Sequence, residues 1–287
     1  MHKKYHSKDI RVAIMQEHYL QRLVEETASY NTLVGSFFPA ALWSPLPHVV
    51  QTWARNYIVS LVTYFLICSL WCFYFYHWKH DVHLSKEAIP SRKSIMLQIH
   101  VSMKAMPWVS MVPTISEYFI EKGYTKCYFS ITEVGPIVYI THTIIHIILV
   151  EFWIYWTHRA LHDVKPLYKH FHFVHHRFNT KTSLSPFAGA ASHPVEAVLD
   201  ALPYTIFLFF VPMHFKTELI LLSINGIWTF TTHGCLETKM WPFLTADYHT
   251  MHHIMHRYNY GNYTILMDWL FGTLCHPYST VDEPKSK

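Results

Sequence analysis

A run of twenty residues without a charged side chain, residues 57–76, limits the possible folds of this sequence more than any other feature. An α-helix of about 20 apolar residues has the length that crosses the hydrocarbon core of a bilayer. Arg55 precedes the run, and the segment after it contains the basic residues Lys79, Lys86, Arg92 and Lys93. Because basic loops favour the cytosolic side, the sequence predicts a membrane-spanning helix followed by a cytosolic loop.

Two more segments are candidates for spanning helices. Residues 134–150 carry no charge, and the apolar pattern continues to Trp156 with aromatic residues typical of a membrane interface. The segment 97–120 is interrupted by Lys104, Pro107, Pro113 and Glu117. It could cross, dip in and return, or lie at the interface, and we favour a crossing.

Two shorter apolar pieces, 202–213 and 219–232, lie later in the chain. Each is too short to cross comfortably, so we expect a membrane hairpin at about 202–232 that returns to the side it entered. The histidine-rich stretches on either side of it would then lie on one face. That face is the cytosol if 97–120 crosses.

The composition supports this organisation. Charged residues make up 15% of the chain, whereas a soluble domain carries about 25%. The net charge of +4 and the lack of a basic run give no indication of nucleic-acid binding. The five cysteines, Cys68, Cys72, Cys127, Cys235 and Cys275, form no C-x-x-C pair, so we expect no structural disulfide. The polar first ten residues do not resemble a signal peptide.

The predicted fold class is therefore all-α, a multi-pass membrane helical protein. A cytosolic, histidine-rich helical cap would hold a dimetal site. The expected divisions are an N-terminal segment (1–56), transmembrane helices (57–157) and a histidine-rich catalytic region (158–287) that contains the hairpin.

Histidine is the unusual residue, with 24 in the chain. Three clusters stand out, and their members are His158 and His162, then His172, His175 and His176, then His249, His252 and His253. Residues three and four apart share a face of a helix, so the rings of each cluster would point the same way. Two clusters have identical H-x2-H-H spacing, which chance does not readily produce.

Eight imidazoles are too many for one metal ion and suit two, because a zinc site takes only three or four protein ligands. All-imidazole ligation is compatible with iron, copper, nickel or zinc, and the lack of cysteine ligands argues against a structural zinc finger. A non-catalytic alternative stays open, in which the chain is a metal-binding membrane scaffold or a zinc carrier.

Other residues could complete the site. His193 and His233 lie in the right regions to be further ligands. His142 and His146, four apart in an apolar segment, could be ligands or could bond to a neighbouring helix. Glu151 shares a helical stripe with the first cluster and could orient a ligand by accepting its second N–H, because ligating histidines usually donate that proton to a carboxylate or carbonyl. It could equally be an interfacial carboxylate at a helix end.

The cluster order and gaps resemble the sterol desaturase/fatty acid hydroxylase superfamily. Longer phrases are similar to the plant sterol C-5 desaturases, of the Δ7-sterol-C5(6)-desaturase or lathosterol oxidase type. These phrases are AIPSRKSIMLQIHVSMKAMPW (88–108), EFWIYWTHRALHDVKPLYKHFHFVHHRFN (151–179), LSPFAGAASHPVEA (184–197) and YHTMHHIMHRYNYGNYTILMDWLFGTL (248–274). The resemblance covers roughly residues 15–278.

This resemblance implies an oxygen-dependent enzyme of the endoplasmic reticulum membrane that introduces the 5,6 double bond into a Δ7 sterol. It implies two iron ions on the cytosolic side, O2 as co-substrate, and electrons from NAD(P)H through cytochrome b5 and its reductase. The implied ligands are the eight clustered histidines, and His193 and His233 also match histidines of the family.

Some positions depart from the pattern. They are Ser192, Asn225, Gly234, residues 245–247, Cys275 and His276. None removes a clustered histidine, but Gly234 stands where aspartate is usual and could loosen the support of the ligands. The metal clusters alone also fit a sterol C-4 methyl oxidase, a fatty acid hydroxylase or an aldehyde-forming wax enzyme, or a paralogue for a specialised sterol or triterpenoid.

Overall fold

Helices make up almost all the regular structure of this chain. The structure is a computed structural model that describes residues 7–78, 89–180, 183–234 and 240–277. The first half contains α1 (Ser7–Gly35), α2 (Ala40–Trp43), α3 (His48–Cys72), η1 (Phe73–Trp78), α5 (Arg92–Val109), α6 (Met111–Glu121), β1 (Cys127–Tyr128) and η3 (Ile131–Glu133). The second half contains α7 (Pro136–Asp163), α8 (Lys165–Leu167), η4 (Tyr168–His172), α9 (Phe173–His176), η5 (Pro186–Ala190), α10 (Pro194–Ile206), η6 (Phe207–Phe209), β2 (Met213–His214), α11 (Phe215–Thr232), α12 (Ala246–Met255) and α13 (Leu266–Leu270).

Two helices in the described ranges are long and apolar enough to cross a membrane. They are the continuous helix His48–Trp78, formed by α3 and η1, and α7. The predicted run 57–76 lies within the first and the predicted segment 134–156 lies mostly within the second. Lys79 and Lys86 of the predicted cytosolic loop lie outside the described residues, so the loop's side stays a prediction.

Both helices keep an apolar stripe exposed. On α3 the stripe is Val62, Leu66 and Leu70, and on α7 it is Ile140, Ile144 and Ile148, each 48–59% exposed. The members of each stripe are four residues apart and therefore lie on one helical face. Soluble monomers rarely leave large contiguous apolar surfaces uncovered, and these stripes are suited to contact with lipid.

The segment 97–120 is not one continuous helix. It is divided between α5 and α6, which meet at Ser110 and have a proline on either side, at Pro107 and Pro113. Neither helix is among the candidate spans in the part of the chain that the structure describes. The full crossing that we favoured is therefore not supported, because the prolines and polar residues shorten the apolar run.

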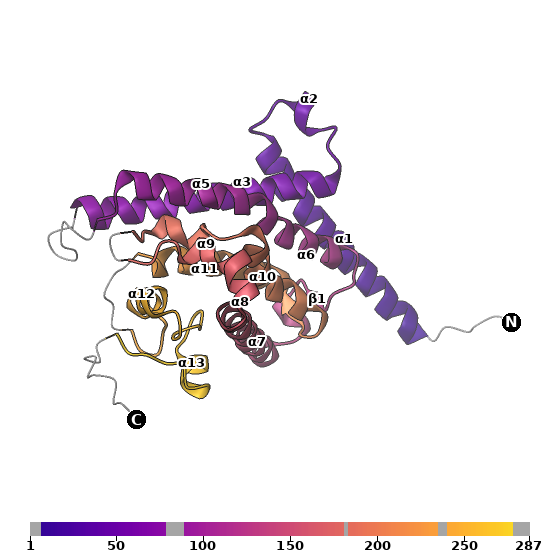
Figure 1. The fold of residues 1–287 in the computed structure, drawn as a ribbon. Coiled ribbons are helices and arrows are strands. Elements are labelled where there is room, and N and C mark those ends of the chain that lie inside the picture. The colour runs from indigo at the N-terminus through magenta and orange to yellow at the C-terminus, as the bar shows by residue number, and fades with distance from the viewer. Residues whose placement is uncertain (1–6, 79–88, 181–182, 235–239, 278–287) are drawn as a thin grey trace.

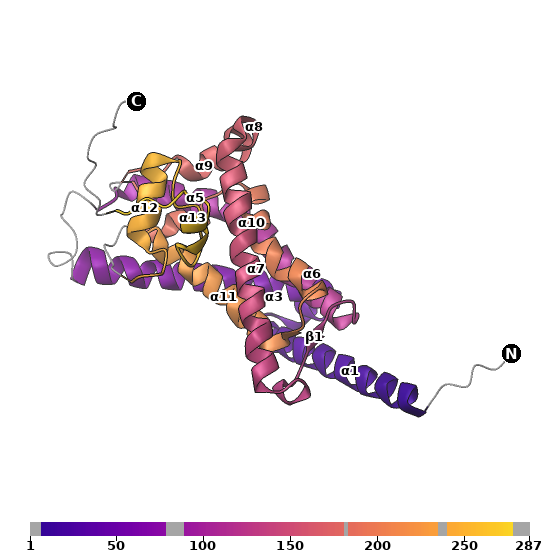
Figure 2. The same ribbon diagram turned by 90° about the horizontal axis from the view of Figure 1, so that it is seen from below.

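Helix α10 lies between the two candidate spans. In Figure 1, α3 and α5 run side by side, whereas α7 is seen almost end-on below them, and Figure 2 shows α7 crossing the direction of α3. Tyr204 of α10 packs in one cluster with Val150 and Ile154 of α7. The Trp153 indole N–H donates to the Leu199 carbonyl at 3.1 Å. Packing through α10 thus joins α7 to α5 and α6.

The predicted hairpin region corresponds to α10 and α11. Glu196, in the first turn of α10, contacts His172, and His233, which caps the end of α11, contacts His175. The segment therefore leaves the histidine clusters and comes back to them. The expected boundary between residues 157 and 158 falls inside α7, which runs unbroken to Asp163.

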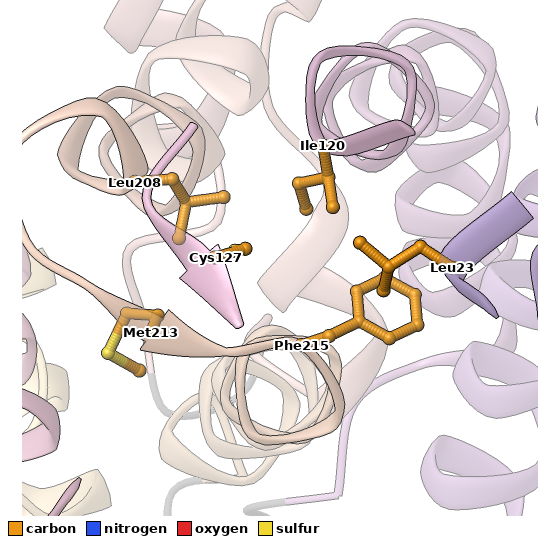
Figure 3. Packing of buried hydrophobic residues seen from close by; sticks show 6 residues of the cluster. All are labelled: Leu23, Ile120, Cys127, Leu208, Met213 and Phe215. Atoms are coloured by element: carbon orange, nitrogen blue, oxygen red, sulfur yellow. The ribbon is translucent and has the colours of Figure 1, made fainter. Parts of the chain in front are cut away.

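Two short strands form a small exception to the helical fold, on the side of the molecule away from the histidines. β1 and β2 form a parallel pair in which Cys127 pairs with Met213 and Tyr128 with His214. Figure 3 shows the core around this pair, which consists of Leu23, Ile120, Cys127, Leu208, Met213 and Phe215. This core fixes α1 and α6 against the turn between α10 and α11. Of the five cysteines, Cys68, Cys72, Cys127 and Cys275 are free thiols, and Cys235 lies outside the described residues.

A glycine allows η5 to approach α11 closely. A Cβ at Gly189 would lie 2.7 Å from the Thr229 carbonyl oxygen and 3.0 Å from the Phe230 Cα. Both neighbours are backbone atoms that cannot rotate away. The contact matters for the site because Gly189 lines both a cavity of about 490 Å3 and the small space against the histidines.

We predict that Gly189→Ala lowers the free energy of unfolding by about 1–3 kcal/mol, because the added methyl overpacks two backbones. Gly226→Ala is the matched control, since the closest atom that the new Cβ would meet, a ring atom of Phe230, lies 3.9 Å away. This change in the interior of α11 should be neutral or stabilising. Thermal unfolding of the detergent-solubilised proteins measures both, and equal effects would contradict the close approach.

Candidate metal centre

The three histidine clusters come together at one end of the fold. His158 and His162 lie in the last two turns of α7, and the second cluster spans η4 and α9. The third cluster lies on α12. Six of these eight side chains are buried, and His158 and His162 are partly buried.

The clustered side chains sort into two groups of potential metal ligands. One group consists of His158, His162, His172, His176 and His252, and the other consists of His175, His233, His249 and His253. Within each group the ligand atoms lie within 4.8 Å of one another. Each group draws on more than one cluster, so only the tertiary fold forms it.

The Nε2 atoms point at one another. In the first group His162 and His172 approach to 2.7 Å between their Nε2 atoms, and His176 and His252 to 3.1 Å. In the second group the Nε2 of His249 lies 3.0 Å from that of His233 and 3.1 Å from that of His253. Metal–nitrogen bonds of about 2.1 Å place neighbouring ligands roughly 3 Å apart, so this spacing suits shared coordination.

The Nδ1 atoms, on the other side of the rings from Nε2, are held by hydrogen bonds to backbone carbonyls in three of these histidines. The Nδ1–H of His158 donates to the Tyr260 carbonyl at 3.0 Å, and that of His252 donates to the Tyr258 carbonyl at 2.7 Å. In the second group the Nδ1–H of His233 donates to the carbonyl of Thr229 at 2.7 Å. A carbonyl oxygen only accepts, so a neutral ring held this way has a bare lone pair on Nε2.

The surroundings also favour neutral rings. Burial, reinforced by the neighbouring imidazoles, lowers the pKa of each α9 and α12 cluster histidine well below its ordinary value. The pKa of His172 is lowered for the same reasons. A lowered histidine pKa means that the ring stays neutral at pH 7, which is the form that binds metal. Nitrogen lone pairs that face one another in a dry interior repel, and a metal cation removes the repulsion. The residues therefore fit a metal in each group.

The structure does not bring His193 into either group. Its Nδ1 accepts a hydrogen bond from the Val195 backbone N–H at 3.2 Å and caps the start of α10. His193 was a candidate ligand because of its region of the sequence and its match to a histidine of the family, but the residue of this segment that reaches the histidines is Glu196. The Nδ1 of His172 and the Glu196 carboxylate are 2.9 Å apart.

Glu151 also differs from the expectation, because its contacts are to a loop and not to a histidine. Its carboxylate accepts the backbone N–H groups of Tyr263 at 2.9 Å and Thr264 at 3.0 Å. Asp268 accepts the N–H groups of Tyr260 and Gly261, each at 2.8 Å. The two carboxylates hold the loop whose Tyr260 carbonyl accepts from His158, so Glu151 supports the orientation of this ring indirectly.

The other histidines that the structure describes lie outside both groups. His146 is fully buried and lies 3.2 Å from the Glu218 carboxylate of α11, which fits the alternative of a bond to a neighbouring helix. His142 is also absent from both groups. His170 is exposed, and His276 contacts the Tyr248 hydroxyl at 2.9 Å. His256 caps α12 with a left-handed backbone.

Sequence reasoning undervalues some of the groups that support the ligands. The only sequence feature that points to Glu196 is its position three residues after His193, at the start of a helix. The carbonyls of Thr229, Tyr258 and Tyr260 carry no side-chain signal at all. Gly234, which departs from the family pattern, has no room for a larger side chain. A Cβ there would lie 2.2 Å from the Trp71 ring, which fills that space.

The fold and site together define a helical protein with two candidate membrane spans and two buried histidine groups. Residues 143–273 match the fatty acid hydroxylase family. This range contains every histidine of both groups.

The chain is 51% identical to the Delta(7)-sterol-C5(6)-desaturase of Nicotiana tabacum over 262 residues, which cover 91% of this chain and 97% of the relative. It is 33% identical to the lathosterol oxidase of Rattus norvegicus, over 90% of this chain and 86% of that one. A Delta(7)-sterol 5(6)-desaturase of Saccharomyces cerevisiae is 28% identical over 89% of this chain and 68% of its own length. The chain therefore belongs to the fatty acid hydroxylase family, among its sterol C-5 desaturases. No solved structure matches the chain significantly.

We predict that His252→Ala and His253→Ala each lower the metal content of the purified protein, because each removes a nitrogen from a different group. His170→Ala makes the same change at an exposed ring and should keep the wild-type content. Elemental analysis of the detergent-purified proteins gives metal atoms per chain. Unchanged content in both site variants would contradict the two-group arrangement.

We further predict that Glu151→Gln weakens metal binding by about 10–100-fold, because one carboxylate oxygen facing the loop N–H groups becomes an amide donor. Glu25→Gln is the control, since this exposed side chain only accepts from Gln21 at 3.0 Å. Competition with a chelator measures the affinity. Equal affinities in the two variants would show that the loop does not support the ligands.

Proposed function

We propose that this protein is an oxygen-dependent sterol C-5 desaturase that introduces the 5,6 double bond into a Δ7 sterol. The observation that carries the proposal is the 51% identity, over nearly all of both chains, to a protein of that name. The two histidine groups supply the metal ligands that such an oxidation requires. The overall reaction removes one hydrogen from each of two adjacent carbons and reduces O2 to two waters with two further electrons.

In this proposal two iron ions occupy the two histidine groups. When bound, they supply the activation of O2 and the oxidising power for breaking unactivated C–H bonds. The histidines hold the ions as neutral ligands, and the carbonyls behind them fix which nitrogen is available. We leave His193 out of the proposed ligand set, and we include His233.

A cavity of about 490 Å3 supports a bulky apolar substrate. It lies between α1, α3, α5, α10 and α11, and much of its lining is apolar, including Val59, Met106, Leu222 and Phe230. Its volume falls within the usual range of small-molecule sites. The cavity walls would exclude water and fix the sterol, so that the two carbons to be oxidised face the histidines.

The cellular setting is part of the same proposal. The protein would lie in the endoplasmic reticulum membrane with the histidine groups on the cytosolic side. Electrons would come from NAD(P)H through cytochrome b5 and its reductase. The two candidate spans and their exposed apolar stripes support the membrane location.

The family match favours one alternative, a hydroxylase that acts on a fatty acyl chain or another lipid. Desaturation and hydroxylation begin with the same hydrogen abstraction and differ in the second step. Abstraction of a second hydrogen gives the alkene, whereas transfer of oxygen to the carbon gives an alcohol. Product analysis therefore separates the two functions.

We predict that the wild-type protein restores 5,6-unsaturated sterols in yeast that lacks its own C-5 desaturase, as measured by mass spectrometry of the sterols. His175→Ala should abolish that product while the protein stays in the membrane fraction, because the second group loses a ligand. His170→Ala should restore the sterols like the wild type. A hydroxylated lipid in place of the alkene, or full product from His175→Ala, would contradict the proposal.

A further inference from the structure

The large cavity reaches the histidines through a shared wall. A smaller space of about 80 Å3 lies directly against His158, His172, His175 and His233. The residues that line both this space and the large cavity are Gly189, Ser192, Asp200, Asn225 and Thr229. We call these five residues the junction. A molecule in the large cavity therefore approaches the metal groups past the junction.

The charged side chains that line the cavity lie at two places. Away from the histidines, Arg55, Asn56 and Glu117 bind one another: the Arg55 guanidinium donates to the Glu117 carboxylate, and Asn56 donates to it at 3.0 Å. These groups satisfy each other and do not line the space against the histidines. They have little capacity left for a ligand.

The junction differs because part of its hydrogen-bonding capacity is unused. The Asp200 carboxylate makes no hydrogen bond or ion pair with any described residue, yet it lines both spaces. Burial raises the pKa of this carboxyl, since few donors stabilise its charged form. A partly buried carboxylate of this kind is stabilised by any donor that a ligand brings.

Asn225 offers the complementary group. Its Oδ1 accepts from the Asn262 Nδ2 at 2.9 Å, which leaves its own Nδ2 as a donor without an acceptor among the described residues. It lies on α11, whereas Asp200 lies on α10. The junction thus presents an acceptor and a donor from two helices.

The position of the hydroxyl group in a sterol decides which end of the molecule must lie at the junction. Its one hydroxyl is on C3, and a single ring carbon separates C3 from C5. If C5 and C6 face the histidines, the hydroxyl must also lie near them, and the side chain must extend into the large apolar cavity. The hydroxyl then falls at the junction and not beside Arg55 and Glu117.

We propose that Asp200 and Asn225 bind the 3-hydroxyl group of the sterol: the Asp200 carboxylate accepts a hydrogen bond from the hydroxyl, and the Asn225 Nδ2 donates one to its oxygen. This inference rests on the proposed function. The two residues are positioning residues, because they fix the register of the ring system without touching the reacting carbons.

The test compares a Δ7 sterol with its 3-deoxy analogue in microsomes that contain the full-length protein, supplied with NADH and O2. Wild-type kcat/KM should be at least about tenfold higher for the hydroxylated sterol, as expected for lost hydrogen bonds to a charged group. Asp200→Leu and Asn225→Leu should each reduce this ratio several-fold. Asp163→Leu makes the same change at a 60% exposed side chain and should keep the wild-type ratio.

The outcomes separate this inference from the proposed function. Structural damage would slow both substrates alike and leave the ratio unchanged, so a ratio retained in both junction variants overturns the assignment. A wild-type ratio near one also overturns it, even where a variant fails to fold. Absence of any 5,6-unsaturated product from the hydroxylated sterol with wild-type protein would instead overturn the proposed function.

Discussion

The meeting of nitrogen lone pairs in a dry interior is the constraint on which this structure depends. Nine imidazoles from five elements are packed so that Nε2 atoms approach within about 3 Å, and three of the rings are fixed by carbonyl acceptors on the other side. A neutral ring donates only one N–H, so the rings whose Nδ1–H is already used present Nε2 lone pairs that repel one another without a cation, and apolar packing alone would not select this arrangement. The helices, caps and loops around the rings therefore hold neutral imidazoles at a spacing that suits metal coordination.

Helix α10 connects this centre to the rest of the molecule. Its first turn supports His172 through Glu196, its middle packs on α7, and Asp200 faces the cavity. Opposite it, α11 carries Asn225 and ends at His233. The hairpin that these helices form thus supplies a candidate ligand, its support and part of the cavity wall, so one packed unit sets the distance between the cavity and the histidine groups.

The loop after α12 shows how distant carboxylates can act on the site. Glu151 on α7 and Asp268 on α13 accept four backbone N–H groups of residues 260–264. Those bonds present the Tyr260 carbonyl to His158. A buried carboxylate is costly unless it is hydrogen-bonded, and here the bonds that offset the cost also fix the loop geometry.

The sequence by itself determined the helical class, the two apolar helices and eight of the ligand candidates. These features depend on local patterns: the length of an uncharged run predicts an apolar helix, and spacings of three and four residues place histidines on one helical face. The tertiary structure decided how the clusters combine, since each group takes rings from different elements. It also decided that His193 caps a helix, that Glu151 binds a loop, and that backbone carbonyls orient the rings. Such contacts join residues up to 113 positions apart, and no local pattern encodes them.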